Sequence, residues 1–175
     1  MRYRALAAIL GLFFLLMLGC GGETPPEKAK ATLVNSQGQQ VGEAQFEETQ
    51  GGVKIILRVE NLPPGVHAFH IHEKGVCVPP DFMSAGGHFN PFGKKHGLKN
   101  PEGPHAGDLP NLVVGADGKE TLEAVASRVT LNPGKNNSLF HPGGTSLVIH
   151  AGPDDYLTDP AGSAGARIAC GVITK

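Results

Sequence analysis

The chain has 175 residues, which predicts one compact domain together with terminal segments that are removed or left flexible. Its 25 glycines and 14 prolines exclude long helices and favour short strands joined by many turns. The net charge is −1, and the sequence contains no basic cluster that would indicate a nucleic-acid partner.

Residues 1–19 have the pattern of an export signal. Arg2 and Arg4 precede an apolar run over residues 5–18, about 14 residues long, whereas a membrane span needs roughly 20. Gly19 and Cys20 close this run and resemble a bacterial lipoprotein processing site. A lipid on Cys20 is the favoured interpretation, and ordinary cleavage nearby or a retained anchor are the alternatives. Residues 20–30 are then a flexible tether, and residues 31–175 form the folded domain.

The cysteine count agrees with export. If Cys20 carries a lipid, only Cys77 and Cys170 remain, and an oxidising compartment would pair them. Two unrelated buried thiols are the alternative. We therefore expect the protein outside the cytoplasm, lipid-anchored on the outer face of the bacterial cell membrane or in the periplasm.

From residue 31 onward the pattern is one of strands and turns. Alternation of apolar and charged residues over 53–60 predicts a strand with one buried face, and Gln50-Gly51-Gly52 marks a hairpin before it. The expected strands cover residues 41–48, 53–60, 67–73, 112–114, 120–129, 146–150 and 167–173. Together these segments predict a sandwich or barrel of about eight short antiparallel strands.

Two segments lack strand signals, residues 74–110 and residues 151–166. Structureless loops of this length in a compact domain are usually functional. Metal ligation and a disulfide could order them.

Histidines are concentrated around these loops. His70 and His72 lie two apart in a strand, so that both rings project from one face and can grip one ion. His150 ends a late strand and could return to that face. The long loop carries three further histidines and an aspartate that suit zinc, although surface histidines in a polar loop are the alternative: His88, His96, His105 and Asp108.

Five ordered motifs resemble the copper,zinc superoxide dismutases. They are HAFHIHE at 67–73, GHFNP at 87–91, HAGDL at 105–109, VIH at 148–150 and GARIACGVI at 165–173. The resemblance covers residues 31–175. It implies an eight-stranded antiparallel Greek-key β-barrel or sandwich with two long functional loops.

The resemblance also implies the site. It assigns copper to His70, His72, His88 and His150, and zinc to His88, His96, His105 and Asp108, so His88 binds both ions. Asp154 would hydrogen-bond to one ligand of each metal, His70 and His96, with a turn residue as the alternative. Cys77 and Cys170 would form the family's disulfide. His67 takes a structural position, and His141 is assigned no role.

The implied reaction is the dismutation of superoxide to dioxygen and hydrogen peroxide, with one copper and one zinc ion per chain. Arg167 would attract the anion, with a surface salt bridge as the alternative, and the His88 ring would take up a proton during the cycle. A surface-tethered copper/zinc storage or chaperone protein and a zinc-stabilised structural module are the other functions considered.

The loop after Cys77 is longer, and the loop after His150 shorter, than in the familiar eukaryotic enzymes. A monomer and a homodimer therefore both remain open.

Overall fold

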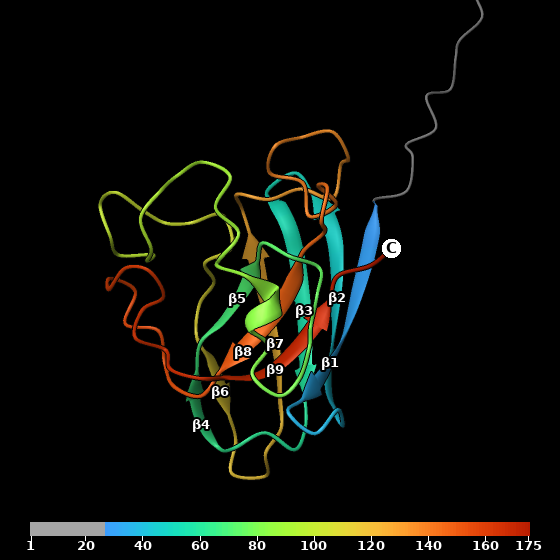
Figure 1. The fold of residues 1–175 in the computed structure, drawn as a ribbon, viewed down its shortest axis with the longest axis vertical. Coiled ribbons are helices and arrows are strands. Elements are labelled where there is room, and N and C mark those ends of the chain that lie inside the picture. Colours follow the sequence, from blue (N-terminus) through green and yellow to red (C-terminus); the bar gives the residue numbers. More distant parts are fainter. Residues whose placement is uncertain (1–26) are drawn as a thin grey trace, which may run out of the picture.

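A computed structural model describes residues 27–175, and in it the chain is folded almost entirely into strands (Figure 1). The nine strands are β1 (Lys28–Asn35), β2 (Gln40–Thr49), β3 (Gly52–Val59), β4 (Gly65–His67), β5 (Phe69–His72), β6 (Leu112–Val114), β7 (Glu120–Ala126), β8 (Ser146–His150) and β9 (Arg167–Val172). Seven of them form one sheet in the order β5-β8-β9-β1-β2-β3-β7, and β4 pairs with β6. Every pairing is antiparallel. Because β9 returns beside β1 after the β1-β2-β3 meander, the connection is of the Greek-key type.

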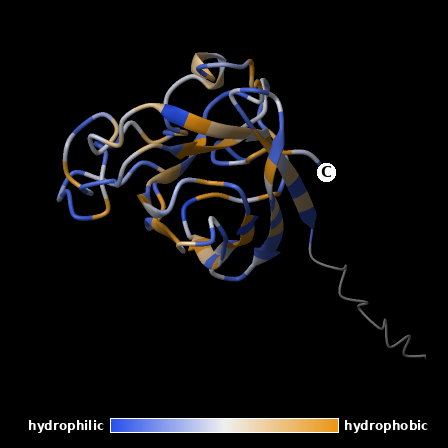
Figure 2. Ribbon diagram, turned by 90° about the horizontal axis from the view of Figure 1, so that it is seen from below, coloured by the Kyte–Doolittle hydropathy of each residue, from blue (hydrophilic) through white to orange (hydrophobic). Residues whose placement is uncertain are grey.

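The sheet curls around one large apolar core, and a smaller apolar cluster lies under the first loop at Phe82 and Cys170. On β3, Val53, Ile55 and Leu57 are fully buried while Arg58 faces solvent, as the alternation in the sequence predicts. Figure 2 shows this alternation as successive orange and blue segments along the strands. The core continues through Phe46 of β2 and Ile149 of β8. Each such side chain contributes about 1.5–3 kcal/mol by leaving water, so the barrel has its own source of stability apart from the loops.

The strand expected over residues 67–73 is divided at Ala68. β4 pairs His67 with Leu112, whereas β5 pairs Phe69 with Ile149. The backbone of Ala68 changes partners at this point, because its N–H donates to the Gly152 carbonyl and its carbonyl accepts the N–H of His150. The single-strand expectation was therefore wrong here. The split, together with β1, which none of the seven expected segments covered, gives the nine strands.

The N-terminal expectations fall largely outside the described residues. The signal segment 1–19, the lipidation residue Cys20 and most of the tether lie there. β1 already begins at Lys28, three residues before the expected domain boundary. Among residues 27–175, no helix has both the length and the apolar character needed to cross a membrane.

The second loop and the later part of the first loop extend from the same side of the barrel, on the left in Figure 1, whereas the beginning of the first loop lies in front of the sheet. Residues 74–110 contain only a short 3-10 turn, η1 (Met83–Ala85), and residues 151–166 contain no regular element. The disulfide Cys77–Cys170 joins the first loop to β9, with a Cα–Cα distance of 5.7 Å. The expected disulfide is thus confirmed, and it ties the first loop to the sheet.

Candidate metal centre

Four buried histidines converge where β5 and β8 meet the first loop. His70 and His72 project from one face of β5, and His150 ends β8 on the same side. His88 reaches them because the first loop runs beside β5, where a bridge pairs His72 with His88. One ring nitrogen from each residue lies within 4.8 Å of the others. We call these four residues the strand-side group.

The ring orientations in the strand-side group indicate a cation site. The outward nitrogens each have an oxygen partner: His70 Nε2–H donates to Asp154 Oδ2 at 3.0 Å, and His72 Nδ1–H donates to the Gly86 carbonyl at 3.0 Å. Within residues 27–175 the inward nitrogens have no partner, and they are His70 Nδ1, His72 Nε2, His88 Nε2 and His150 Nε2. Buried polar atoms are normally paired, so four lone pairs aimed at one point fit a metal ion.

A second group is built around one carboxylate of the first loop. Asp108 Oδ1 lies 2.9 Å from His88 Nδ1, 3.1 Å from His96 Nδ1 and 3.4 Å from His105 Nδ1. The other oxygen, Oδ2, accepts the backbone N–H groups of Gly97 and His105. All four side chains are buried. Three imidazoles and a carboxylate are a donor set that suits tetrahedral zinc. We call these four residues the loop-side group.

His88 belongs to both groups. Its Nδ1 faces Asp108 in the loop-side group, and its Nε2 is the nitrogen that faces the strand-side group. The two nitrogens of an imidazole can each bind a cation when the ring is fully deprotonated. The geometry therefore permits one ring to join two metal ions.

Burial sets the charge state of the strand-side group. It lowers the pKa of His88 to about 4 and that of His150 to about 4. It also lowers the pKa of His70 and, more strongly, that of His72. These rings are therefore neutral near pH 7, which is the form that binds metals.

The loop-side group carries charge. Burial alone would lower the pKa of His96, but its hydrogen bonds to Asp108 and Asp154 outweigh burial and raise the pKa to about 9. Burial opposes the charge of Asp108 as well, yet hydrogen bonds from His105, His88 and His96 hold the pKa of that carboxyl far below its usual range. In the metal-free protein, a positive ring thus lies between two carboxylates.

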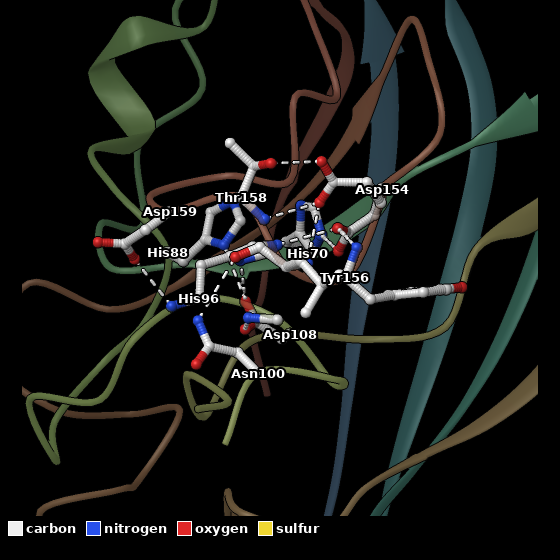
Figure 3. A network of polar contacts seen from close by, with 12 residues as sticks. His70, His88, His96, Asn100, Asp108, Asp154, Tyr156, Thr158 and Asp159 are labelled. Atoms are coloured by element: carbon white, nitrogen blue, oxygen red, sulfur yellow. Dashed lines mark hydrogen bonds and ion pairs between the residues drawn. The ribbon is translucent and has the colours of Figure 1, made fainter. Parts of the chain in front are cut away.

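Asp154, from the second loop, connects the two groups. Its Oδ2 accepts from His70 Nε2 at 3.0 Å, and its Oδ1 accepts from His96 Nε2 at 2.9 Å (Figure 3). These hydrogen bonds hold the pKa of the Asp154 carboxyl below its usual range despite its burial. Such partners fix the orientation of a ligand ring. The expected contacts of Asp154 are therefore present in the structure.

Comparison with known proteins agrees with this geometry. Residues 40–173 match the family model described as copper/zinc superoxide dismutase (SODC). "Superoxide dismutase [Cu-Zn] 2" of Aquifex aeolicus is 58% identical over 147 residues, covering 83% of this chain and 86% of that protein. The chain belongs to the copper/zinc superoxide dismutase family. It is an oxidoreductase of the Cu-Zn superoxide dismutase type, and its cofactors are copper and zinc.

Solved structures show the same fold. A superoxide dismutase-like protein from Bacillus subtilis is 47% identical, with a TM-score of 0.80 over 82% of this chain and 96% of that one. The Cu/Zn superoxide dismutase from Brucella abortus is 34% identical, with a TM-score of 0.70 over 85% of this chain and all of that one. The expected antiparallel barrel is thus confirmed.

Arg167 of this dismutase is fixed at the edge of the metal centre. Its Nη1–H donates to the Phe82 carbonyl and its Nη2–H to the Gly86 carbonyl, both at 2.7 Å. The disulfide holds the loop that supplies these carbonyls. A cavity of about 430 Å³ is lined by Arg167 together with His72, His88, His105, His150 and Pro160. The guanidinium and the strand-side group therefore share one opening.

The remaining histidines of the dismutase lie outside both groups. His67 is buried and contacts the carbonyl oxygens of His150 and Pro63 through its two ring nitrogens, at 2.9 and 2.8 Å. His141 stacks on Phe89 beside a larger cleft of about 850 Å³. That cleft is larger than the cavity at Arg167, but it does not contain either group of converging ligand atoms.

Sequence reasoning missed three residues that support this site. Asp159 Oδ1 accepts the backbone N–H of His96 at 2.8 Å. Asn111 and Tyr156 hold Asp154 through further hydrogen bonds. Asp159 and Asn111 act on backbone groups, and no spacing rule in the sequence indicates their contacts. The Tyr156 N–H makes the turn bond that an Asp side chain often accepts from two residues on, so Asp154 is also a turn residue.

Proposed function

We propose that the strand-side group holds copper, that the loop-side group holds zinc, and that His88 binds both ions in a centre that dismutates superoxide. The observation that supports this most is the convergence of four unpartnered, buried ring nitrogens beside a carboxylate-centred group that shares one ring. The four imidazole nitrogens suit copper, and the aspartate with three imidazoles suits zinc. When bound, copper supplies the one-electron chemistry that converts two superoxide ions and two protons into dioxygen and hydrogen peroxide.

The position of the cavity favours the same assignment. His72 and His150, which belong only to the strand-side group, line the opening. His105 of the loop-side group lines it too, whereas the side chains of His96 and Asp108 are fully buried and do not. A redox ion must meet its substrate, whereas a structural ion can be closed off, so the group with more of its ligands at the opening suits copper.

The protein's own residues attract the anion and deliver a proton. Arg167 uses two of its five N–H donors on carbonyl oxygens, which leaves donors for an anion in the cavity. His88 Nε2 is the atom that we propose holds the transferred proton while Nδ1 remains on the loop side.

We further propose that the enzyme acts outside the cytoplasm, attached through a lipid on Cys20. The apolar run that ends at Gly19-Cys20 supports a lipid anchor. The Cys77–Cys170 disulfide supports an oxidising compartment, because disulfides rarely persist in a reducing cytosol.

Metal content and superoxide removal, measured on the purified full chain, test the assignment. We expect one copper and one zinc per chain. His150→Ala should abolish dismutation and leave zinc bound, because His150 belongs only to the strand-side group. Asp108→Ala should weaken zinc binding, because Asp108 belongs only to the loop-side group. A copper-loaded, oxidised wild-type chain without dismutase activity would contradict the enzyme and favour a copper/zinc store.

A further inference from the structure

Tyr156 has an unusual backbone conformation beside the metal centre. Its φ is 68°, in the left-handed region that non-glycine residues seldom adopt. Such conformations persist where the surroundings hold them, and they cluster at functional sites. Tyr156 is not a ligand in either group, so its conformation must be held by other contacts.

Three polar atoms of Tyr156 join three parts of the site. Its N–H donates to Asp154 Oδ1 at 2.6 Å, and its carbonyl accepts the N–H of Lys99 at 3.1 Å. Its phenol oxygen accepts the N–H of Asn111 at 2.8 Å. The Tyr156 carbonyl also lies so close to Gly97 that a Cβ there would overlap it. Tyr156 thus binds the second loop to the first loop just after His96, and to Asn111, three residues after Asp108.

Asn111 completes the frame around Asp154. The Asn111 Nδ2–H donates to the Asp154 carbonyl, and the Asp154 N–H donates to Asn111 Oδ1, both at 2.9 Å. The backbone of Asp154 is therefore held by Asn111, and its side chain is aimed by the N–H of Tyr156. Figure 3 shows Tyr156 directly beside Asp154, whose carboxylate reaches His70 and His96.

We propose that Tyr156 is a positioning residue that holds Asp154, and through it His70 and His96, in their ligand orientations before a metal ion binds. This inference rests on the proposed ligand assignment. Loss of a direct outer partner of a ligand lowers metal affinity by about 10–100-fold. Tyr156 acts one contact further out, so we expect loss of its hydroxyl to weaken zinc binding by about three- to tenfold.

The test is zinc affinity of the full chain, measured by competition with a chelator. Tyr156→Phe removes only the hydroxyl that accepts from Asn111. We expect the zinc dissociation constant to rise about three- to tenfold, with a changed visible spectrum when cobalt occupies the zinc position. Lys99→Met is the matched control. The Lys99 ammonium lies over the Tyr156 ring at 5.2 Å, but the backbone contact of Lys99 survives the change. We expect that variant to bind zinc like the wild type.

Measuring the effect of Tyr156→Phe in a chain that already lacks the Asp154 carboxylate separates a positioning role from a merely structural one. If Tyr156 acts through Asp154, Tyr156→Phe should have no further effect on zinc affinity in an Asp154→Ala chain. A structural role would lower the thermal midpoint of the metal-free protein and leave zinc affinity unchanged. Wild-type zinc affinity and cobalt spectrum in Tyr156→Phe would overturn this inference alone. A wild-type chain that binds no zinc would overturn the ligand assignment and this inference with it.

Discussion

At the scale of single residues, we propose that Arg167 attracts the anion to a chain that is slightly acidic overall. The whole sequence has a charge of −1, so attraction of superoxide must come from a local cation. Two carbonyl oxygens of the first loop fix the guanidinium at the cavity. A unit-charge pair about 5 Å apart interacts by roughly 3 kcal/mol at an effective dielectric of about 20, and an open cavity leaves about 1–2 kcal/mol of this.

Arg167→Ile should therefore lower the superoxide rate about tenfold with both metals retained, and Arg167→Glu should lower it further. The wild-type rate should fall as ionic strength rises, and the rate of the Ile variant should fall less, because screening acts on the charge that was removed. Arg58→Ile is the matched control, since it removes the same charge from the exposed face of β3. Equal rates and salt slopes in the wild type and Arg167→Ile would remove Arg167 from the mechanism.

The raised pKa of His96 predicts that a proton is released when zinc binds. Its pKa is raised to about 9 by Asp108 and Asp154, from a usual value near 6.5. A raised pKa means that the ring is protonated at pH 7.5, and a ligand nitrogen must lose that proton to bind zinc. Calorimetry of the metal-free chain, in two buffers with different ionisation enthalpies, should give about one proton released per zinc. The His96→Gln variant should release close to none. A wild-type value near zero would mean that His96 is neutral before zinc binds.

At the scale of elements, the two groups differ in what holds them. His70, His72 and His150 of the strand-side group stand on β5 and β8, which the barrel core fixes. The ligands that belong only to the loop-side group come from the first loop, and among them only Asp108 is bridged to a strand, at His70 of β5. We therefore expect the strand-side group to be formed by the barrel itself, whereas the loop-side group is held by hydrogen bonds among its own residues and should be stabilised further when zinc binds.

Hydrogen exchange should separate these two cases. Zinc at about 100 times its dissociation constant stabilises the bound state by about 2.7 kcal/mol. Some loop amides can exchange only after zinc has dissociated and the loop has opened locally. Exchange of those amides should slow by up to about a hundredfold. We expect this slowing over residues 88–110 and 151–166. The amides of β2 and β3 serve as the internal control and should change little, because their core does not include the ligands. Uniform slowing across sheet and loops would show instead that the whole domain is stabilised as one unit.

The sequence predicts these elements unevenly, for physical reasons. β6 and β8 have the expected bounds, and the one-sided burial of β3 follows from an alternation that only Ile56 interrupts. The break at Ala68 was missed because an exchange of strand partners leaves no mark on hydropathy. The loop residues alone already indicated a zinc-type donor set, and His70 and His72 a shared metal-binding face. That His88 joins the strand histidines and binds both ions was expected only through the family resemblance, since spacing alone does not say which loop histidine meets the strands. Tyr156 and Asn111 were missed because they act mainly through backbone groups.

At the scale of the whole molecule, the metal centre and the N-terminal end of the domain lie on different sides. β1 begins beside the C-terminus, where Lys175 Nζ lies 3.4 Å from Glu27 Oε1, and the second loop and the later part of the first loop lie on the opposite side in Figures 1 and 2. Six residues separate Cys20 from Glu27. The seven residue steps from Cys20 to Glu27 span at most about 25 Å, so a lipid on Cys20 would hold the barrel close to the bilayer. Attachment at that end leaves the cavity at Arg167 open to solvent.

Cys20→Ser should consequently change where the enzyme is found without changing its rate. We expect the variant in the soluble fraction or as an unprocessed precursor, whereas the wild type should fractionate with membranes, because a diacyl anchor gives stable attachment. Activity per bound copper should be equal in the two proteins, since the metal centre faces away from the tether. Separation of membranes followed by immunoblotting and a dismutase assay on each fraction measures both quantities. A Cys20→Ser product of unchanged size that remains with the membranes would contradict the lipid anchor. A correctly released variant with altered activity per copper would instead show that the membrane surface affects access to the cavity.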